Sequence, residues 1–159
     1  MQALSIVYLP HAPASVSVAR RHLIRELLAS GVSDDTADDA AVIVSELLSN
    51  ALRHARPLEG EASQVRVAWT RVGDTVEVAV TDGGAVTEPR KGQPALSSLG
   101  GRGLGIVETL AQSWGVRRDE HGSTVWALLH APAAVGVGAG EGLMNDSGTP
   151  VQNLLEGTR

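Results

Sequence analysis

Cysteine is absent from this 159-residue chain, which excludes disulfides, thiolate nucleophiles and cysteine-ligated zinc or iron–sulfur sites. Phenylalanine is absent too, so Val, Leu, Ile, Ala and three tryptophans must fill the interior. The five histidines are scattered along the chain and form no metal-spaced pair such as H-E-x-x-H. Metal sites built on sulfur or on paired histidines are therefore excluded.

A dense basic surface is also missing. The formal net charge is −5, and charges of both signs are interleaved, which argues against direct nucleic-acid binding although not against binding one nucleotide. No apolar run approaches the roughly 18 residues that a membrane span needs. The N-terminus has no basic region of the signal-peptide type, and Pro10 ends its apolar start early. We expect a cytoplasmic protein with no membrane partner.

The length predicts one domain, over residues 1–131, followed by a tail over 132–159 that is rich in Ala and Gly and is expected to be disordered. Within the domain, period-two and period-3.6 patterns separate strands from helices. We expect an edge strand at 4–9, an irregular loop at 83–99, helices at 13–30, 34–55 and 104–113, and hairpins pairing 65–69 with 76–80 and 116–118 with 124–129.

The second of these helices carries a polar face that suits phosphate chemistry. Glu46, Asn50 and Arg53 fall within an arc of roughly 60° on a helical wheel. An amide oxygen of Asn50 suits Mg²⁺, which prefers oxygen ligands and takes only one or two from protein. Glu46 could accept the proton of a hydroxyl that attacks a γ-phosphate, and Arg53 could reach a phosphate oxygen. The alternative is an ordinary solvated helix face, because polar pairs four residues apart are common.

Two glycine-containing fragments follow. Asp82 ends an alternating strand, where its carboxylate could accept a hydrogen bond from the exocyclic amine of adenine while Gly84 leaves room for the base. The alternative is a simple Asp-Gly turn.

The run Gly101–Gly105 opens a helix and lets backbone amides approach phosphates, with Arg102 as a secondary candidate for phosphate contact. It is neither a Walker A loop nor a good Rossmann fingerprint, and it too could be a purely structural turn.

In this order the fragments resemble the GHKL ATPase superfamily. Glu46–His54 resembles its N box, Asp82–Gly84 its G1 box and Gly101–Gly105 its G2 box, while Gly122–Trp126 looks like the G-x-T segment that closes the adenine pocket. The resemblance implies an α+β fold, the two-layer α/β sandwich called the Bergerat fold. It has a mixed, mostly antiparallel sheet covered on one face by about three helices.

The same resemblance assigns the cofactors, ATP and Mg²⁺, to particular positions. It implies that Asn50 holds Mg²⁺, that Asp82 reads adenine and that residues 85–99 form an ATP lid. The remaining cofactor-binding positions that it implies are Arg53, Gly84, Gly101, Arg102, Gly103, Leu104, Gly105 and Thr124.

Two longer phrases narrow the resemblance to the anti-sigma factor serine kinase family, over about residues 5–130. They are Val-Ser-Glu-Leu-Leu-Ser-Asn-Ala-Leu-Arg-His-Ala and Gly-Gly-Arg-Gly-Leu-Gly-Ile-Val-Glu. Membership would imply a homodimer that binds a sigma factor and phosphorylates a serine of an antagonist protein, with Glu46 as general base, to switch partners. One alternative is an ATP-binding module whose lid state sets partner affinity without phosphoryl transfer. A histidine-kinase catalytic half fits less well, because the chain leaves no room for a dimerising two-helix hairpin.

Overall fold

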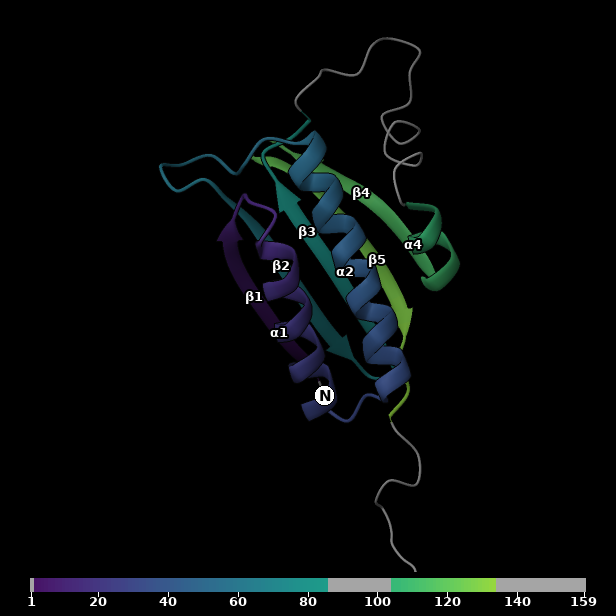
Figure 1. The fold of residues 1–159 in the computed structure, drawn as a ribbon. Helices are drawn as coiled ribbons and strands as arrows, with labels where there is room; N and C mark the ends of the chain where they lie inside the picture. Colours follow the sequence, from purple (N-terminus) through teal and green to yellow (C-terminus); the bar gives the residue numbers. More distant parts are fainter. Residues whose placement is uncertain (1, 86–103, 134–159) are drawn as a thin grey trace, which may run out of the picture.

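The computed structural model describes residues 2–85 and 104–133 of the chain. The order of its elements is the expected one (Figure 1). They are β1 (Gln2–Pro10), α1 (Ser15–Ala29), α2 (Asp34–His54), β2 (Gln64–Val72), β3 (Thr75–Asp82), α4 (Leu104–Leu110), β4 (Ser113–Asp119) and β5 (Gly122–His130). Most of the expected lid and tail lies outside the described residues.

The five strands form one sheet in the order β1-β2-β3-β5-β4, which places β1 at an edge as predicted. The expectation of a mixed sheet is wrong for the described strands, since all four pairings are antiparallel. The reason lies in the connections. Two hairpins join β2 to β3 and β4 to β5, and two successive helices between β1 and β2 return the chain in the opposite direction. The α+β class and the two-layer arrangement are confirmed.

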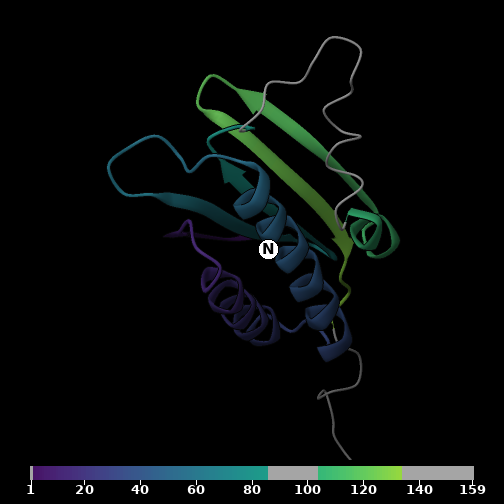
Figure 2. The same ribbon diagram turned by 45° about the horizontal axis from the view of Figure 1, so that its top comes forward.

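Helices α1 and α2 lie side by side on the same face of the sheet, and α4 packs against α2 (Figures 1 and 2). The start of α2 has the expected cap: the Ser33 hydroxyl accepts a hydrogen bond from the Thr36 amide at 3.3 Å, and Asp34 and Asp35 occupy the positive end of the helix dipole. None of the helices within the described ranges combines the length and apolar character that a membrane span requires.

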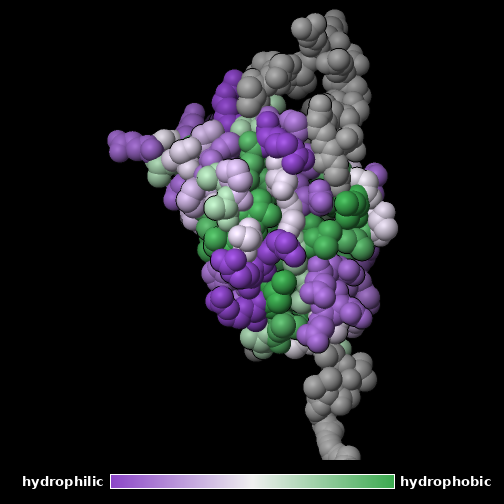
Figure 3. All heavy atoms as spheres, in the orientation of Figure 1, coloured by the Kyte–Doolittle hydropathy of each residue, from purple (hydrophilic) through white to green (hydrophobic). Residues whose placement is uncertain are grey.

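The hydrophobic core fills the space between these helices and the sheet. Its largest fully buried side chains come from both layers and are Leu23, Leu27, Ile43, Leu47, Leu48, Leu104, Val44, Val65, Val67, Val76, Val78 and Val80. On the outside of the helices, hydrophilic residues are spread over the surface with apolar residues between them (Figure 3). Burial of one stripe on each helix and one face of the sheet therefore holds the two layers together.

The end of α4 differs from prediction. The predicted helix over 104–113 ends at Leu110, because the amide of Gln112 donates to the Leu128 carbonyl at 2.7 Å and residues from Ser113 onward pair with β5. At the other end of the sheet, Ala133 forms an isolated bridge with Val32. Ala133 is also the last residue that the structure describes.

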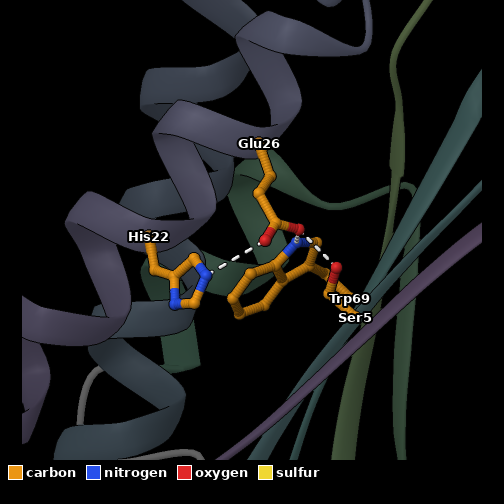
Figure 4. Close-up of polar contacts among 4 residues, drawn as sticks. All are labelled: Ser5, His22, Glu26 and Trp69. Atoms are coloured by element: carbon orange, nitrogen blue, oxygen red, sulfur yellow. Dashed lines mark hydrogen bonds and ion pairs between the residues drawn. The ribbon is translucent and has the colours of Figure 1, made fainter.

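A polar cluster fixes α1 to the sheet (Figure 4). The Glu26 carboxylate accepts hydrogen bonds from the Trp69 indole N–H at 3.1 Å and from the Ser5 hydroxyl, and it lies 3.0 Å from His22 Nε2. These partners, the Ser5 hydroxyl first among them, hold the pKa of Glu26 below its usual value despite the opposing effect of burial. Since Ser5 lies on β1 and Trp69 on β2, one side chain of α1 joins both strands.

We expect Glu26→Ala to lower the free energy of unfolding by about 1–2 kcal/mol, because the buried indole N–H of Trp69 and the half-buried hydroxyl of Ser5 would lose their acceptor. Urea denaturation measures the change. The matched control is Arg25→Ala, an exposed neighbour on the same helix, which should stay within about 0.5 kcal/mol of the wild type. Equal effects of the two substitutions would show that the cluster contributes nothing specific.

Candidate nucleotide site

The polar face of α2 presents an amide oxygen with no protein partner. Asn50 is buried, and its side-chain nitrogen donates to the Glu46 carbonyl at 3.0 Å. That bond fixes the amide and leaves Asn50 Oδ1 buried without a hydrogen-bond partner in the described part of the chain. A buried acceptor left without a donor costs about 1–3 kcal/mol, so this oxygen is suited to a ligand that the protein itself does not supply.

Mg²⁺ fits this oxygen. The ion takes oxygen ligands and is commonly held by one or two protein groups together with substrate phosphates. In residues 2–85 and 104–133, no group of three or more His, Asp or Glu side chains could hold a metal without such help. Of the two predicted neighbours on the helix, Glu46 is half-buried one turn before Asn50, and Arg53 is exposed near the helix end.

Asp82 closes the end of β3 as a buried carboxylate. The residue is 5% exposed, and its Oδ1 accepts a hydrogen bond from the Gly84 amide at 2.8 Å. Burial raises the pKa of Asp82 to about 6, and the Gly84 hydrogen bond, His11 and Arg118 only partly oppose this rise. A ligand that donates an N–H to this carboxylate would favour its ionised form.

A backbone clamp holds the Asp82 turn against the end of α2. The Arg56 amide donates to the Gly84 carbonyl at 2.9 Å, and the Gly83 amide donates to the Arg56 carbonyl at 2.7 Å. The Arg56 guanidinium also donates to the Ala85 carbonyl at 2.9 Å, next to an isolated bridge between Ala55 and Ala85. The two motifs, separated by some thirty residues in sequence, are therefore joined by direct hydrogen bonds.

The clamp and its surroundings depend on residues that sequence reasoning did not assign to the site. A Cβ at Gly83 would lie 2.1 Å from the Pro57 carbonyl oxygen, and a Cβ at Gly122 would lie 2.0 Å from the Asp82 carbonyl oxygen. His11 Nε2 lies 3.1 Å from the Ala55 carbonyl. Gly83 belongs to the Asp-Gly-Gly segment and Gly122 to the G-x-T segment, so their place in these motifs could have identified them from the sequence. Nothing in the sequence distinguishes His11 or Arg56.

Gly84 has a φ of 102°, and no atom lies within 4 Å of the position a Cβ would occupy there. This conformation favours glycine, and the open space is consistent with the predicted room for a base. Leu104 is 1% exposed in the hydrophobic core, so only its backbone is available to a ligand, while Gly105 lies exposed within α4. The predicted positions Gly101, Arg102 and Gly103 lie outside the described residues.

Thr124 is not brought to the face of the sheet that carries Asp82. Its hydroxyl lies 2.7 Å from that of Thr81, and the register places Ser123, not Thr124, directly opposite Asp82. Side chains alternate between the two faces of a strand, so adjacent residues cannot both face the helices. On this geometry Ser123 is the member of the G-x-T segment that shares the face of Asp82.

The chain is similar in sequence to known proteins. The sequence profile described as "Histidine kinase-like ATPase domain" matches residues 9–129. The chain is 32% identical over 128 residues to a protein of Listeria monocytogenes named "Serine-protein kinase RsbW", an alignment that covers 74% of this chain and 81% of that protein. A protein of the same name from Bacillus licheniformis is 30% identical over 121 residues, covering 69% and 75% of the two chains.

A solved structure shares the fold. It contains the RsbU and RsbW domains of Rv1364c from Mycobacterium tuberculosis, and it matches with a TM-score of 0.62 at 20% identity. The match covers 82% of this chain and 34% of that longer one. At this level of identity the likeness concerns the fold alone.

The pKa of Asp82 makes stability depend on pH. Because the folded state binds this proton more tightly than an unfolded chain with the usual value of 3.8, the free energy of unfolding should fall as pH rises from about 4 to about 6. The whole rise of the pKa from 3.8 to about 6 corresponds to about 3 kcal/mol, of which about 2 kcal/mol is lost between pH 4 and pH 6. We expect Asp82→Asn to lack this component, as measured by urea denaturation of the nucleotide-free protein at several pH values. Identical pH profiles for the variant and the wild type would contradict the assignment.

Proposed function

Because this chain belongs to the histidine kinase-like ATPase family, we propose that it is an ATP-dependent protein serine kinase that acts as an anti-sigma factor. The relatives named serine-protein kinase support the activity. The observation that carries the proposal is the buried, partnerless oxygen of Asn50, one helical turn from Glu46 and joined through the backbone clamp to the Asp82 turn. That arrangement offers Asn50 for a metal ion, Asp82 for the adenine ring and Glu46 for the proton of a substrate hydroxyl.

The proposed nucleotide contacts follow from these groups. The Asp82 carboxylate accepts the exocyclic N–H of adenine, with Gly84 leaving room beside the ring and Ser123 on the same face of the sheet. Asn50 Oδ1 would hold Mg²⁺, which when bound neutralises charge on the triphosphate. Arg53 and the segment Gly101–Gly105, with Arg102, complete the contacts to phosphate.

Phosphoryl transfer then requires one proton acceptor from the chain. The hydroxyl oxygen of the substrate serine forms a bond to the γ-phosphorus as the bond between that phosphorus and the β–γ bridging oxygen breaks, and ADP leaves. Glu46 takes the serine proton. The position of Glu46 one turn from the amide of Asn50 supports this role, because a base must lie near the reacting hydroxyl while the metal lies near the phosphates.

The partners proposed for this activity are a sigma factor and an antagonist protein that carries the substrate serine. Phosphorylation of the antagonist would lower its affinity for the kinase and leave the kinase free to hold the sigma factor. We place this exchange in the cytoplasm, with the kinase acting as a homodimer.

The base is tested by Glu46→Ala. We expect transfer of labelled γ-phosphate to a purified antagonist to fall by about 10²- to 10⁴-fold, the usual contribution of a general base, while calorimetry shows ATP affinity within about twofold of the wild type. Asp38→Ala removes an exposed carboxylate two turns earlier on the same helix and should leave both measurements unchanged. Full transfer by the Glu46 variant would remove this residue from the mechanism. Nucleotide binding without transfer even in the wild type would favour an ATP-binding module that does no chemistry.

The metal ligand is tested by Asn50→Ala. We expect the affinity for ATP in the presence of Mg²⁺ to fall by about 1.5–3 kcal/mol, the typical loss for a contact that involves a charged group. The affinity measured with EDTA should change much less, so the variant should respond weakly to magnesium in calorimetry. Ser49→Ala, the preceding residue, serves as control. An unchanged magnesium response in the Asn50 variant would show that its oxygen does not hold the ion.

A further inference from the structure

A row of polar residues crosses three neighbouring strands at the end of the sheet that carries Asp82. Ser123 of β5 lies directly opposite Asp82 of β3, and Arg118 of β4 lies directly opposite Ser123. Directly opposite residues of antiparallel strands share one face of the sheet, and Asp82 alternates in phase with the core valines of β3. Asp82, Ser123 and Arg118, which we call the site row, therefore lie on the face that the helices cover.

The charge of Arg118 acts on the acid at the other end of the site row. Burial raises the pKa of Asp82, and the positive charge of Arg118 is among the effects that partly oppose this rise. His11 acts in the same direction, but its Nε2 already lies 3.1 Å from the Ala55 carbonyl. Arg118 is exposed, and within residues 2–85 and 104–133 its guanidinium forms no hydrogen bond or ion pair. This cation is thus near the site and available to a ligand.

The preceding residue on β4 is also an exposed arginine, but it has protein partners on the opposite face of the sheet. The Arg117 guanidinium lies over the Trp126 ring, 5.6 Å from its centroid, and 3.7 Å from the Glu77 carboxylate. Side chains alternate along a strand, so these two neighbouring arginines have the same charge and different surroundings. Only Arg118 shares a face with Asp82.

Beside the site row, the same face of the sheet has an apolar surface that is more open toward β4. The neighbouring row consists of Val80, Val125 and Val116, one from each of the same three strands. Val80 is 1% exposed, whereas Val125 and Val116 are half-buried. The reason is the placement of the helices: α2 packs on β3, whereas α4 lies beside the end of β4 from which that strand starts (Figure 1).

An adenine ring whose amino group binds Asp82 would occupy the space next to these valines. Two strand spacings, about 10 Å, separate Asp82 from Arg118 along the site row, and Ser123 lies between them. A ring held at Asp82 and extending toward β4 therefore ends beside Arg118. The groups proposed for the metal and for phosphate belong to helices or to the glycine segment, so Arg118 is placed to meet the base.

The chemistry of a guanidinium suits this position. It is planar and always charged, and it stacks on aromatic rings by cation–π attraction. The valine row offers an apolar contact to the base from the sheet, while Arg118 approaches from the open side at β4. An exposed guanidinium can cover the ring there without losing any hydrogen bond to the described part of the protein.

We propose that Arg118 is a further nucleotide-binding residue, whose guanidinium stacks on the adenine ring and closes the side of the pocket that faces β4. This inference rests on the proposed function, since it requires ATP bound with its base at Asp82. It adds a specific requirement: Arg118 contributes to the affinity for the base itself, independently of the number of phosphates.

Arg118→Ala tests the contact. Displacement of a fluorescent ATP analogue gives the Kd of adenosine, ADP and Mg–ATP, and we expect the variant to raise all three by the same factor, about 5- to 20-fold. Arg117→Ala is the matched control, because it removes the same charge from the adjacent position on the opposite face, and it should leave all three values within about twofold of the wild type. Both variants should unfold in urea as single cooperative transitions.

Two further substitutions separate stacking from charge. Arg118→Tyr provides a flat ring without a charge and should recover most of the affinity, whereas Arg118→Lys keeps the charge without the plane and should stay impaired. Unchanged affinity of Arg118→Ala, an equal loss in Arg117→Ala, a loss that grows with each phosphate, or recovery by lysine alone would each overturn the inference and leave the proposed function standing. A wild type that binds none of the three nucleotides would overturn both.

Discussion

The backbone clamp between the end of α2 and the turn after β3 is the constraint on which the candidate site depends. Asn50 and Glu46 belong to the helix layer, whereas Asp82 belongs to the sheet, and packing between layers alone would allow small relative shifts. The Arg56–Gly84 and Gly83–Arg56 hydrogen bonds connect the two backbones directly. Gly83 permits the contact, because any larger residue would place an atom against the carbonyl of Pro57. The two groups that we propose for the metal and for adenine lie on different layers, and the clamp keeps them at a constant separation, as the proposed phosphoryl transfer would require.

The sheet presents two faces of different composition. Its inner face supplies Val65, Val67, Val76, Val78 and Val80 to the core and ends in Asp82 at the site. Its outer face carries the exposed apolar residues of β1 and the stacked pair of Trp126 and Arg117. Because adjacent residues of a strand face opposite ways, Ser123 and Thr124 belong to different surfaces. Changes on one face can therefore be made with little effect on the other.

Periodicity predicted most of the fold because burial imposes it directly. Alternation at period two located β2 and β3, and the cap at Ser33 located the start of α2. The end of α4 was misplaced, since pairing of β4 with β5 competes with helix formation after Leu110. The purely antiparallel sheet could not be predicted from the individual strands, because strand direction depends on how the connections cross the sheet.

Within the site, the spacing of Glu46, Asn50 and Arg53 was visible on a helical wheel. The roles of Arg56 and His11 were not, because both act through backbone groups that lie far away in sequence.

Local sequence was sufficient for the chemistry of the fragments: an amide and a carboxylate on one helix, an acid before two glycines, and a chain without thiols. These follow from residue type and spacing, which do not change on folding. Tertiary structure decided which fragments meet and which side chains share a face. Within the described residues, the partnerless oxygen of Asn50, the raised pKa of Asp82 and the position of Ser123 on the face of Asp82 all arise from burial and strand register. Burial and register are properties of the packed molecule, because they depend on contacts between segments that are remote along the chain.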